Sequence, residues 1–201
     1  MKMSGLLVAG VALGCIPGYA AGSGNAVDLF YIPSADFEVS DSIDSVSVDG
    51  DGFGAQGRFM VADQLFVGAE YQQVEMDDVP IEISQLRFRV IGALPLSAGV
   101  NLTLEGGYID ADIDIGVFSL SGDGPMGHVG VEFRPSETLT LFGKAGIVKV
   151  DDVDGPEFHL GVRAQVSEVI GLLADYRMTS LEESGEELEL DDLRVGVSFL
   201  F

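Results

Sequence analysis

Apolar and polar residues alternate with a period of two along almost the whole chain, from residue 26 to residue 201. Successive side chains of an extended strand point to opposite faces, so this period predicts β-strands with one apolar and one polar face. In the last segment, for example, positions 193, 195, 197, 199 and 201 are all apolar. Ten such segments are found, with bounds close to 26–38, 52–62, 65–76, 82–94, 99–110, 125–134, 138–150, 157–167, 169–180 and 189–201.

The connections between these segments alternate in length. Short connections are expected near 62–64, 95–97, 135–137 and 167–168, and longer ones near 39–51, 77–81, 111–124, 151–156 and 181–188. Short turns at one end and longer loops at the other are typical of an antiparallel up-and-down transmembrane β-barrel. An even number of strands would place both ends of the chain on the periplasmic side. Pro33 interrupts the first segment, so an eight-stranded barrel is the alternative.

Charge and apolar surface must lie in different places in this chain. It carries 33 acidic and 10 basic residues, a formal net charge of −23, yet it is 47% hydrophobic with a mean hydropathy of +0.31. A transmembrane barrel separates the two by facing lipid with its apolar face and the lumen with its polar face. A soluble barrel would have to enclose aromatic side chains from nearly every strand, and we regard it as the less favoured alternative. So strong a polyanion is also expected not to bind nucleic acid.

The first twenty residues have the pattern of a cleaved signal peptide. Lys2 is followed by an apolar run over 6–16 that is too short to span a bilayer, and Gly18-Tyr19-Ala20 offers small residues at a cleavage site. We therefore expect export through the Sec route, a signal peptide over 1–20 and a barrel domain over 21–201. An uncleaved anchor and lipidation at Cys15, the single cysteine, are the alternatives.

The polar face of the predicted strands collects most of the basic residues. Buried charges must pair, because burying an unpaired charge costs on the order of several kcal/mol. We therefore expect a salt-bridge network that closes the lumen, and a narrow passive pore for small solutes is the alternative. The predicted network contains Arg58, Glu70, Arg87, Arg89, Glu105, His128, Glu132, Lys144, His159, Arg163, Asp175, Arg177 and Arg194, with Asp28 on the same face.

The longer connections and their borders are strongly acidic. Segments 36–51, 75–82, 110–123, 151–157 and 182–192 hold 25 of the 33 acidic residues and no Lys or Arg. We expect a hydrated, repulsive outer rim with weak Mg²⁺ or Ca²⁺ binding, because these cations prefer carboxylate oxygens. The spacing defines no specific metal site or cofactor; the weak candidates are Asp151, Asp152, Asp154, Glu186 and Glu187.

The end of the sequence resembles the assembly signal of bacterial outer-membrane barrels, since apolar residues at every second position, Val195, Val197 and Phe199, lead to Phe201. With the signal peptide and the strand pattern, the chain resembles the small outer-membrane β-barrel superfamily, which includes OmpA-type and OmpX-type barrels. The resemblance implies a Gram-negative outer-membrane location, contact with membrane lipid and lipopolysaccharide, and recognition by the barrel-assembly machinery. It departs from OmpA itself, since no peptidoglycan-binding domain is expected after the barrel.

Catalytic motifs are absent from the sequence: it has no nucleophile elbow, Walker-type loop or zinc motif. Glu157-Phe158-His159 faintly resembles the Asp-x-His pair of the omptin proteases, which are also ten-stranded. We expect no enzyme activity and a structural or surface-interaction role with no identified extracellular partner. A surface hydrolase that uses His128 and His159 is the remaining alternative.

Overall fold

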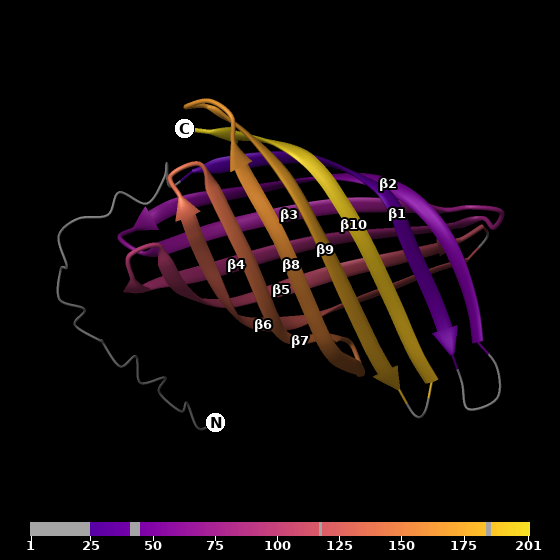
Figure 1. The fold of residues 1–201 in the computed structure, drawn as a ribbon. Coiled ribbons are helices and arrows are strands. Elements are labelled where there is room, and N and C mark those ends of the chain that lie inside the picture. The colour runs from indigo at the N-terminus through magenta and orange to yellow at the C-terminus, as the bar shows by residue number, and fades with distance from the viewer. Residues whose placement is uncertain (1–24, 41–44, 117, 184–185) are drawn as a thin grey trace, which may run out of the picture.

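The protein forms a closed antiparallel barrel in a computed structural model that describes residues 25–201 except 41–44, 117 and 184–185 (Figure 1). The expected signal peptide over 1–20 lies outside the described residues. Each strand pairs with its neighbours in sequence, and the first pairs with the last, which confirms the ten-stranded prediction. The strands are β1 (Ala26–Ser40), β2 (Ser45–Ala62), β3 (Leu65–Met76), β4 (Ile81–Ser97), β5 (Val100–Ile115), β6 (Phe118–Ser136), β7 (Leu139–Val150), β8 (Val153–Gln165), β9 (Ile170–Glu183) and β10 (Glu186–Leu200). Within the described residues, no helix is long and apolar enough to cross a membrane.

Proline 33 is accommodated by an irregularity rather than by loss of β1. The register of β1 shifts between Tyr31 and Ser34 against β10, and between Ile32 and Ala35 against β2. A bulge leaves a residue outside the ladder, so the missing N–H of proline breaks no regular hydrogen bond. The eight-stranded alternative is therefore wrong.

The strands extend further toward one end of the barrel than the sequence suggested. Most of the predicted long loops over 39–51 and 111–124 are strand, because β2 begins at Ser45 and β5 and β6 are joined through residues 116–117. The prediction of long loops there was wrong. In β5 the alternation simply continues, with Ile109 and Ile113 inside and Asp110 outside, and acidic residues are compatible with strands whose outer face meets water. We call this end, where hairpins join β1–β2, β3–β4, β5–β6, β7–β8 and β9–β10, the outer end.

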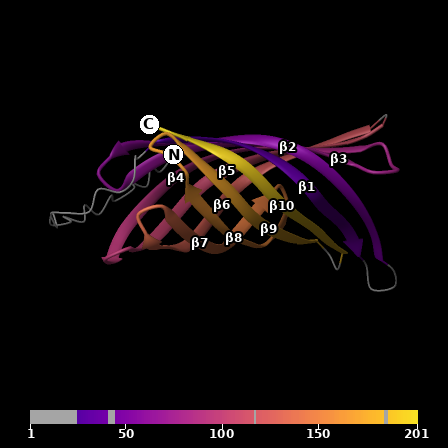
Figure 2. The same ribbon diagram turned by 45° about the horizontal axis from the view of Figure 1, so that its top comes forward.

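Both figures show the strands crossing the barrel obliquely, with the C-terminus at the end opposite to these hairpins (Figures 1 and 2). The start of the described chain lies at the same end, where Phe201 N donates a hydrogen bond to Asn25 O at 3.3 Å. We call this end, which the topology predicts to be periplasmic, the inner end.

The apolar face of the strands changes along the barrel axis, from the outward face to the inward face near the outer end. Over most of its height the outward face is apolar and exposed, as at Phe88 and Leu160, whose exposed fractions are 54% and 64%. Toward the outer end, apolar side chains turn inward. We call these inward residues the apolar layer; it consists of Phe30, Ile32, Ala35, Val74, Met76, Ile83 and Leu190 in one cluster and Ile109, Met126 and Val148 in a second. Around this layer the outward face carries carboxylates, as expected for a barrel end surrounded by water.

Four tyrosines mark the level at which the faces exchange. Tyr31, Tyr71, Tyr108 and Tyr176 all point outward and are 42–50% exposed. Their hydroxyl groups donate hydrogen bonds toward the outer end, to Asp51, Gln73, Asp123 and Asp191 respectively. Aromatic girdles with one apolar and one hydrated side are typical of membrane–water interfaces. We call this set the tyrosine ring and take it as the outer limit of the apolar band.

Candidate functional site

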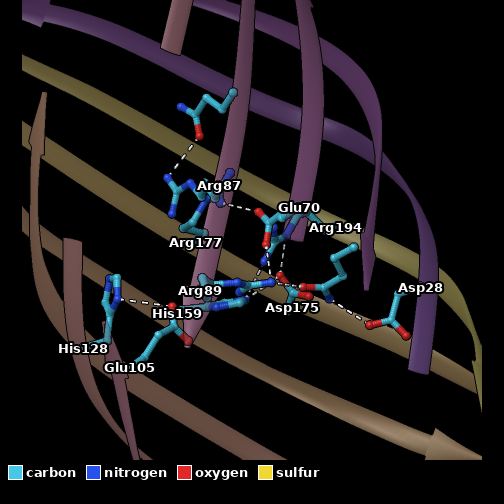
Figure 3. Close-up of polar contacts among 12 residues, drawn as sticks. Asp28, Glu70, Arg87, Arg89, Glu105, His128, His159, Asp175, Arg177 and Arg194 are labelled. Atoms are coloured by element: carbon cyan, nitrogen blue, oxygen red, sulfur yellow. Dashed lines mark hydrogen bonds and ion pairs between the residues drawn. The ribbon is translucent and has the colours of Figure 1, made fainter. Parts of the chain in front are cut away.

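The centre of the barrel holds a buried cluster of arginines and carboxylates (Figure 3). Glu70 on β3 forms ion pairs with three arginines, at 3.1 Å to Arg89, 2.8 Å to Arg177 and 2.9 Å to Arg194. These arginines come from β4, β9 and β10, so one carboxylate links strands that lie on different sides of the barrel. The side chains of Arg177 and Arg194 are only 1% and 0% exposed.

Two aspartates complete the pairing of the central arginines. Arg177 lies 2.8 Å from Asp192, and Arg194 lies 2.5 Å from Asp175. Every one of these groups faces the interior because it occupies an alternate position on its strand. Arg177 and Arg194 each have at least two carboxylate partners and Arg89 has one, so the cluster meets the condition under which buried charge is tolerated.

A second cluster joins the centre to strands β5 to β8. Glu157 is fully buried and forms an ion pair with Arg87 at 2.7 Å, and it accepts a hydrogen bond from Thr179 at 3.0 Å. His128 lies between two carboxylates, with Nε2 3.0 Å from Glu157 and Nδ1 3.4 Å from Glu105. Figure 3 shows His128 beside Glu105.

His159 is also enclosed by the network. Its Nε2 lies 2.8 Å from Asp175 and 2.6 Å from Arg194, and the edge of its ring meets the ring of Phe142 at a centroid distance of 5.4 Å. Both histidines are buried, with exposed fractions of 4% and 5%. Neither is presented at the outer surface, where a surface hydrolase would need it.

Toward the inner end the interior opens into a polar cavity of about 100 Å³, which we call the vestibule. Its lining includes Arg58, which pairs with Glu132 at 3.2 Å, and Arg163, which pairs with Asp28 at 2.8 Å. Lys144 also lines it and lies 3.0 Å from Glu105. The vestibule ends at the central cluster, since Arg89 contributes to both.

The structure places every residue of the predicted lumen network in the interior, and each takes part in at least one ion pair. Two network members were missed. Glu157 and Asp192, which we assigned to the acidic rim, are 0% exposed and lie inside. Their strand parity matches that of His159 and Arg194, and this was the signal that could have found them.

The apolar layer was not expected either, because the strand pattern predicts a lumen that is polar throughout. Ile32, Val74 and Val148 are 0% exposed, and partly buried residues such as Val48 and Leu181 pack around them. The layer draws side chains from strands around the barrel. The interior is therefore filled twice, by charged pairs at the centre and by apolar side chains beyond them.

The weak metal candidates are not brought together. Asp151 and Asp152 form the exposed turn between β7 and β8, and Asp154 lies opposite Glu182 on β9. Glu187 accepts a hydrogen bond from Ser180 at 2.7 Å, and the side chain of Glu186 lies outside the described residues. Among the described residues, no group of three or more His, Cys, Asp or Glu side chains is placed to hold a metal ion.

The residues of the expected assembly signal face outward on β10. Val195, Val197, Phe199 and Phe201 are 37–60% exposed, in line with the apolar band. The ring of Phe201 lies 6.2 Å from that of Phe59, so the two aromatic rings meet at the inner end.

Comparison with known proteins identifies the fold. The model of the outer membrane protein beta-barrel domain matches residues 6–201. Among solved structures, the outer membrane protease OmpT from Escherichia coli has a TM-score of 0.58 at 10% identity, over 90% of this chain and 98% of that chain. The translocator domain of autotransporter NalP from Neisseria meningitidis has a TM-score of 0.54 at 14% identity, over 90% of both chains.

An outer membrane channel from Pseudomonas putida F1 is also similar, with a TM-score of 0.52 at 9% identity, over 92% of this chain and 100% of that chain. No curated protein matches the sequence. At such low identities the three structures share the fold with this chain and nothing finer.

Proposed function

The chain belongs to the outer membrane protein beta-barrel domain family, and from this premise we propose that it is a sealed barrel with a structural or surface-interaction role. A family of this kind resides in the outer membrane of Gram-negative bacteria. We further propose that the protein reaches this membrane through the Sec route and the barrel-assembly machinery, with Val195, Val197, Phe199 and Phe201 as the assembly signal.

The observation that supports a sealed barrel is the double filling of its interior. A solute would first meet the apolar layer and then the central cluster. Removing one partner of a buried ion pair costs about 3–5 kcal/mol. A passage through the centre would separate several such pairs, among them Arg177–Asp192 and Arg194–Asp175.

The two alternatives are less well supported. A narrow passive pore needs a continuous hydrated path, and Ile32 and Val74 lie fully buried where that path would run. A surface hydrolase needs reachable histidines, and His128 and His159 lie within the network. The likeness to OmpT concerns the fold and lends no support to proteolysis.

We propose that the surface role lies in the carboxylates outside the apolar layer. They sit beyond the tyrosine ring, at the height of lipopolysaccharide headgroups, whose phosphates are also negative. Divalent cations relieve this repulsion, and the absence of an assembled site among the described residues is compatible with weak, distributed Mg²⁺ or Ca²⁺ binding, on the order of millimolar.

Single-channel recording in planar bilayers tests the proposal. We expect the folded wild-type barrel to produce no regular conductance steps under conditions in which a general porin conducts. The double variant Ile32→Ala with Val74→Ala, which shortens two side chains of the apolar layer, is recorded beside the wild type. Leu172→Ala on the lipid face is the matched control. Regular, ion-selective conductance steps from the wild-type protein would contradict the sealed barrel and support the passive pore.

A further inference from the structure

Several basic residues of this acidic protein share one cavity. The chain has only 10 basic residues against 33 acidic ones. Four of the ten, Arg58, Arg89, Lys144 and Arg163, line the vestibule, together with three carboxylates. Lys149, near the outer end of β7, alternates with the inward Val148 and faces outward. The vestibule therefore holds four basic side chains against three carboxylates, in a molecule whose outward carboxylates gather toward the outer end.

The vestibule cations differ from those of the central cluster in their access to solvent. The side chains of Arg58, Arg163 and Lys144 are 26%, 18% and 14% exposed, whereas those of Arg177 and Arg194 are 1% and 0% exposed. Access comes from the inner end, because the central cluster and the apolar layer fill the interior beyond. A ligand would consequently enter from the periplasmic side.

Hydrogen-bonding capacity remains open around the cavity. Within the described structure, the buried atoms Arg89 Nε, His159 Nδ1 and Asp28 Oδ1 have no hydrogen-bond partner. All three residues line the vestibule, and the side chains of Arg89 and His159 are 8% and 6% exposed. An unmade hydrogen bond at a buried polar group is costly, so these atoms favour an occupant that supplies partners. Arg89 Nε is a donor, and Asp28 Oδ1 can only accept.

Contacts with Phe66 and Glu132 fix the position of the Arg58 side chain. Its guanidinium packs over the ring of Phe66 at 5.1 Å from the centroid, and Nη1 pairs with Glu132 at 3.2 Å. This arrangement fixes the side chain while leaving it a quarter exposed. A guanidinium presents several N–H donors in a plane, which suits phosphate and carboxylate oxygens.

Space at this level is kept open by inward glycines. A Cβ atom at Gly130 would meet the side chains of Thr103 and Lys144, and one at Gly161 would meet those of Phe142 and Asp175. The cavity of about 100 Å³ has room for several water molecules or for one tetrahedral oxyanion.

We propose that the vestibule is a binding site for a small hydroxylated oxyanion, of which hydrogen phosphate is the simplest example, that enters from the periplasmic side. Arg58, Lys144 and Arg163 supply positive charge, and Arg89 Nε donates to an oxygen of the ligand. Asp28 accepts from the ligand's hydroxyl group, which explains a carboxylate in an anion site. The same chemistry is available from free phosphate and from a phosphate monoester headgroup of a periplasmic-leaflet lipid.

Calorimetric titration of the folded barrel in a phosphate-free, non-ionic detergent tests this site. Inorganic phosphate is the probe, with NaCl at matched ionic strength as the reference. We expect saturable binding that Arg58→Gln weakens at least tenfold. Arg58→Gln should fold, because Glu132 retains Arg134 at 3.6 Å, and heat-modifiable gel mobility verifies it. Lys149→Gln removes an equal charge outside the vestibule and should change the affinity less than twofold.

The membrane arm of the same experiment separates the two sources. Equal phosphate affinity in detergent and in vesicles that contain a phosphate monoester lipid identifies free phosphate as the ligand. Weaker apparent affinity in those vesicles, but not in phosphatidylcholine vesicles, identifies the headgroup, and either result supports the site. If phosphate gives no saturable heat beyond matched NaCl, or if Lys149→Gln weakens binding as much as Arg58→Gln, the vestibule is not an oxyanion site.

Discussion

Glu70 is the residue whose loss should reveal most about the interior. Its carboxylate is 2% exposed and lies within 3.1 Å of three arginines. Glu70→Gln keeps the shape but removes the negative charge that these guanidinium groups share. Arg177 and Arg194 retain Asp192 and Asp175, whereas Arg89 keeps only the neutral Gln56 at 3.0 Å. We expect the free energy of unfolding to fall by about 3–5 kcal/mol, the range for breaking a buried pair.

A double-mutant cycle separates the ion pair from a general loss of packing. Arg89→Gln alone should cost less than Glu70→Gln, because Glu70 keeps two arginines. The double variant should be more stable than the sum of the single effects predicts, by about 1–3 kcal/mol, as for residues in one network. Because the chain contains no tryptophan, the folded fraction is best measured by heat-modifiable gel mobility and circular dichroism across a urea series.

Glu70→Gln combined with Lys149→Gln is the control cycle, since Lys149 faces outward near the outer end. Those two effects should add within about 0.5 kcal/mol. If the Glu70–Arg89 cycle is equally additive, the charges are not coupled through a dry interior. That result would contradict the sealed barrel and favour a hydrated interior.

Three further predictions follow from the outer faces of the barrel. Leu172→Arg, on the exposed apolar face near the expected bilayer midplane, should lower the free energy of unfolding in vesicles by about 2–4 kcal/mol. Gln165→Arg at the inner mouth should lower it clearly less. Equal losses would contradict our assignment of the lipid and lumen faces. Phe201→Ala should reduce the amount of heat-modifiable barrel recovered in outer-membrane fractions, while Phe59→Ala, its ring neighbour, should affect stability more than recovery; unchanged recovery for both would argue against an assembly signal. Millimolar Mg²⁺ should raise the melting temperature more than NaCl of equal ionic strength, because carboxylates bind divalent cations and merely screened charges do not distinguish them; equal shifts would reduce the acidic rim to a repulsive surface.

Strand parity explains why so much of the interior could be predicted. A period of two assigns each residue to a face without any knowledge of its neighbours, so Arg87 and Arg194 are placed inside by counting alone. Their partners cannot be obtained this way. Arg194 meets Glu70, which is 124 positions earlier in the sequence, and this contact depends on how β3 and β10 are positioned across the closed barrel.

The errors have a common cause, because runs of acidic residues predict loops but here also occur within strands. At Asp110 and Asp112 the alternation continues, but the roles of the two faces are reversed. The same assumption placed Glu157 and Asp192 on the rim, although their parity points inward. Alternation determines which residues share a face, and the surrounding solvent determines which face is apolar.

The exchange of faces at the tyrosine ring also fixes how the protein sits vertically in a bilayer. If the barrel sank by one residue, about 3.3 Å along a strand, carboxylates such as Asp51 and Asp191 would approach the hydrocarbon. If it rose, the apolar rings of Phe59 and Phe201 would leave the hydrocarbon at the inner end. The barrel is thus anchored against movement in both directions. In bilayers of longer or shorter acyl chains, the lipid around the barrel, rather than its depth of insertion, should adjust to the mismatch.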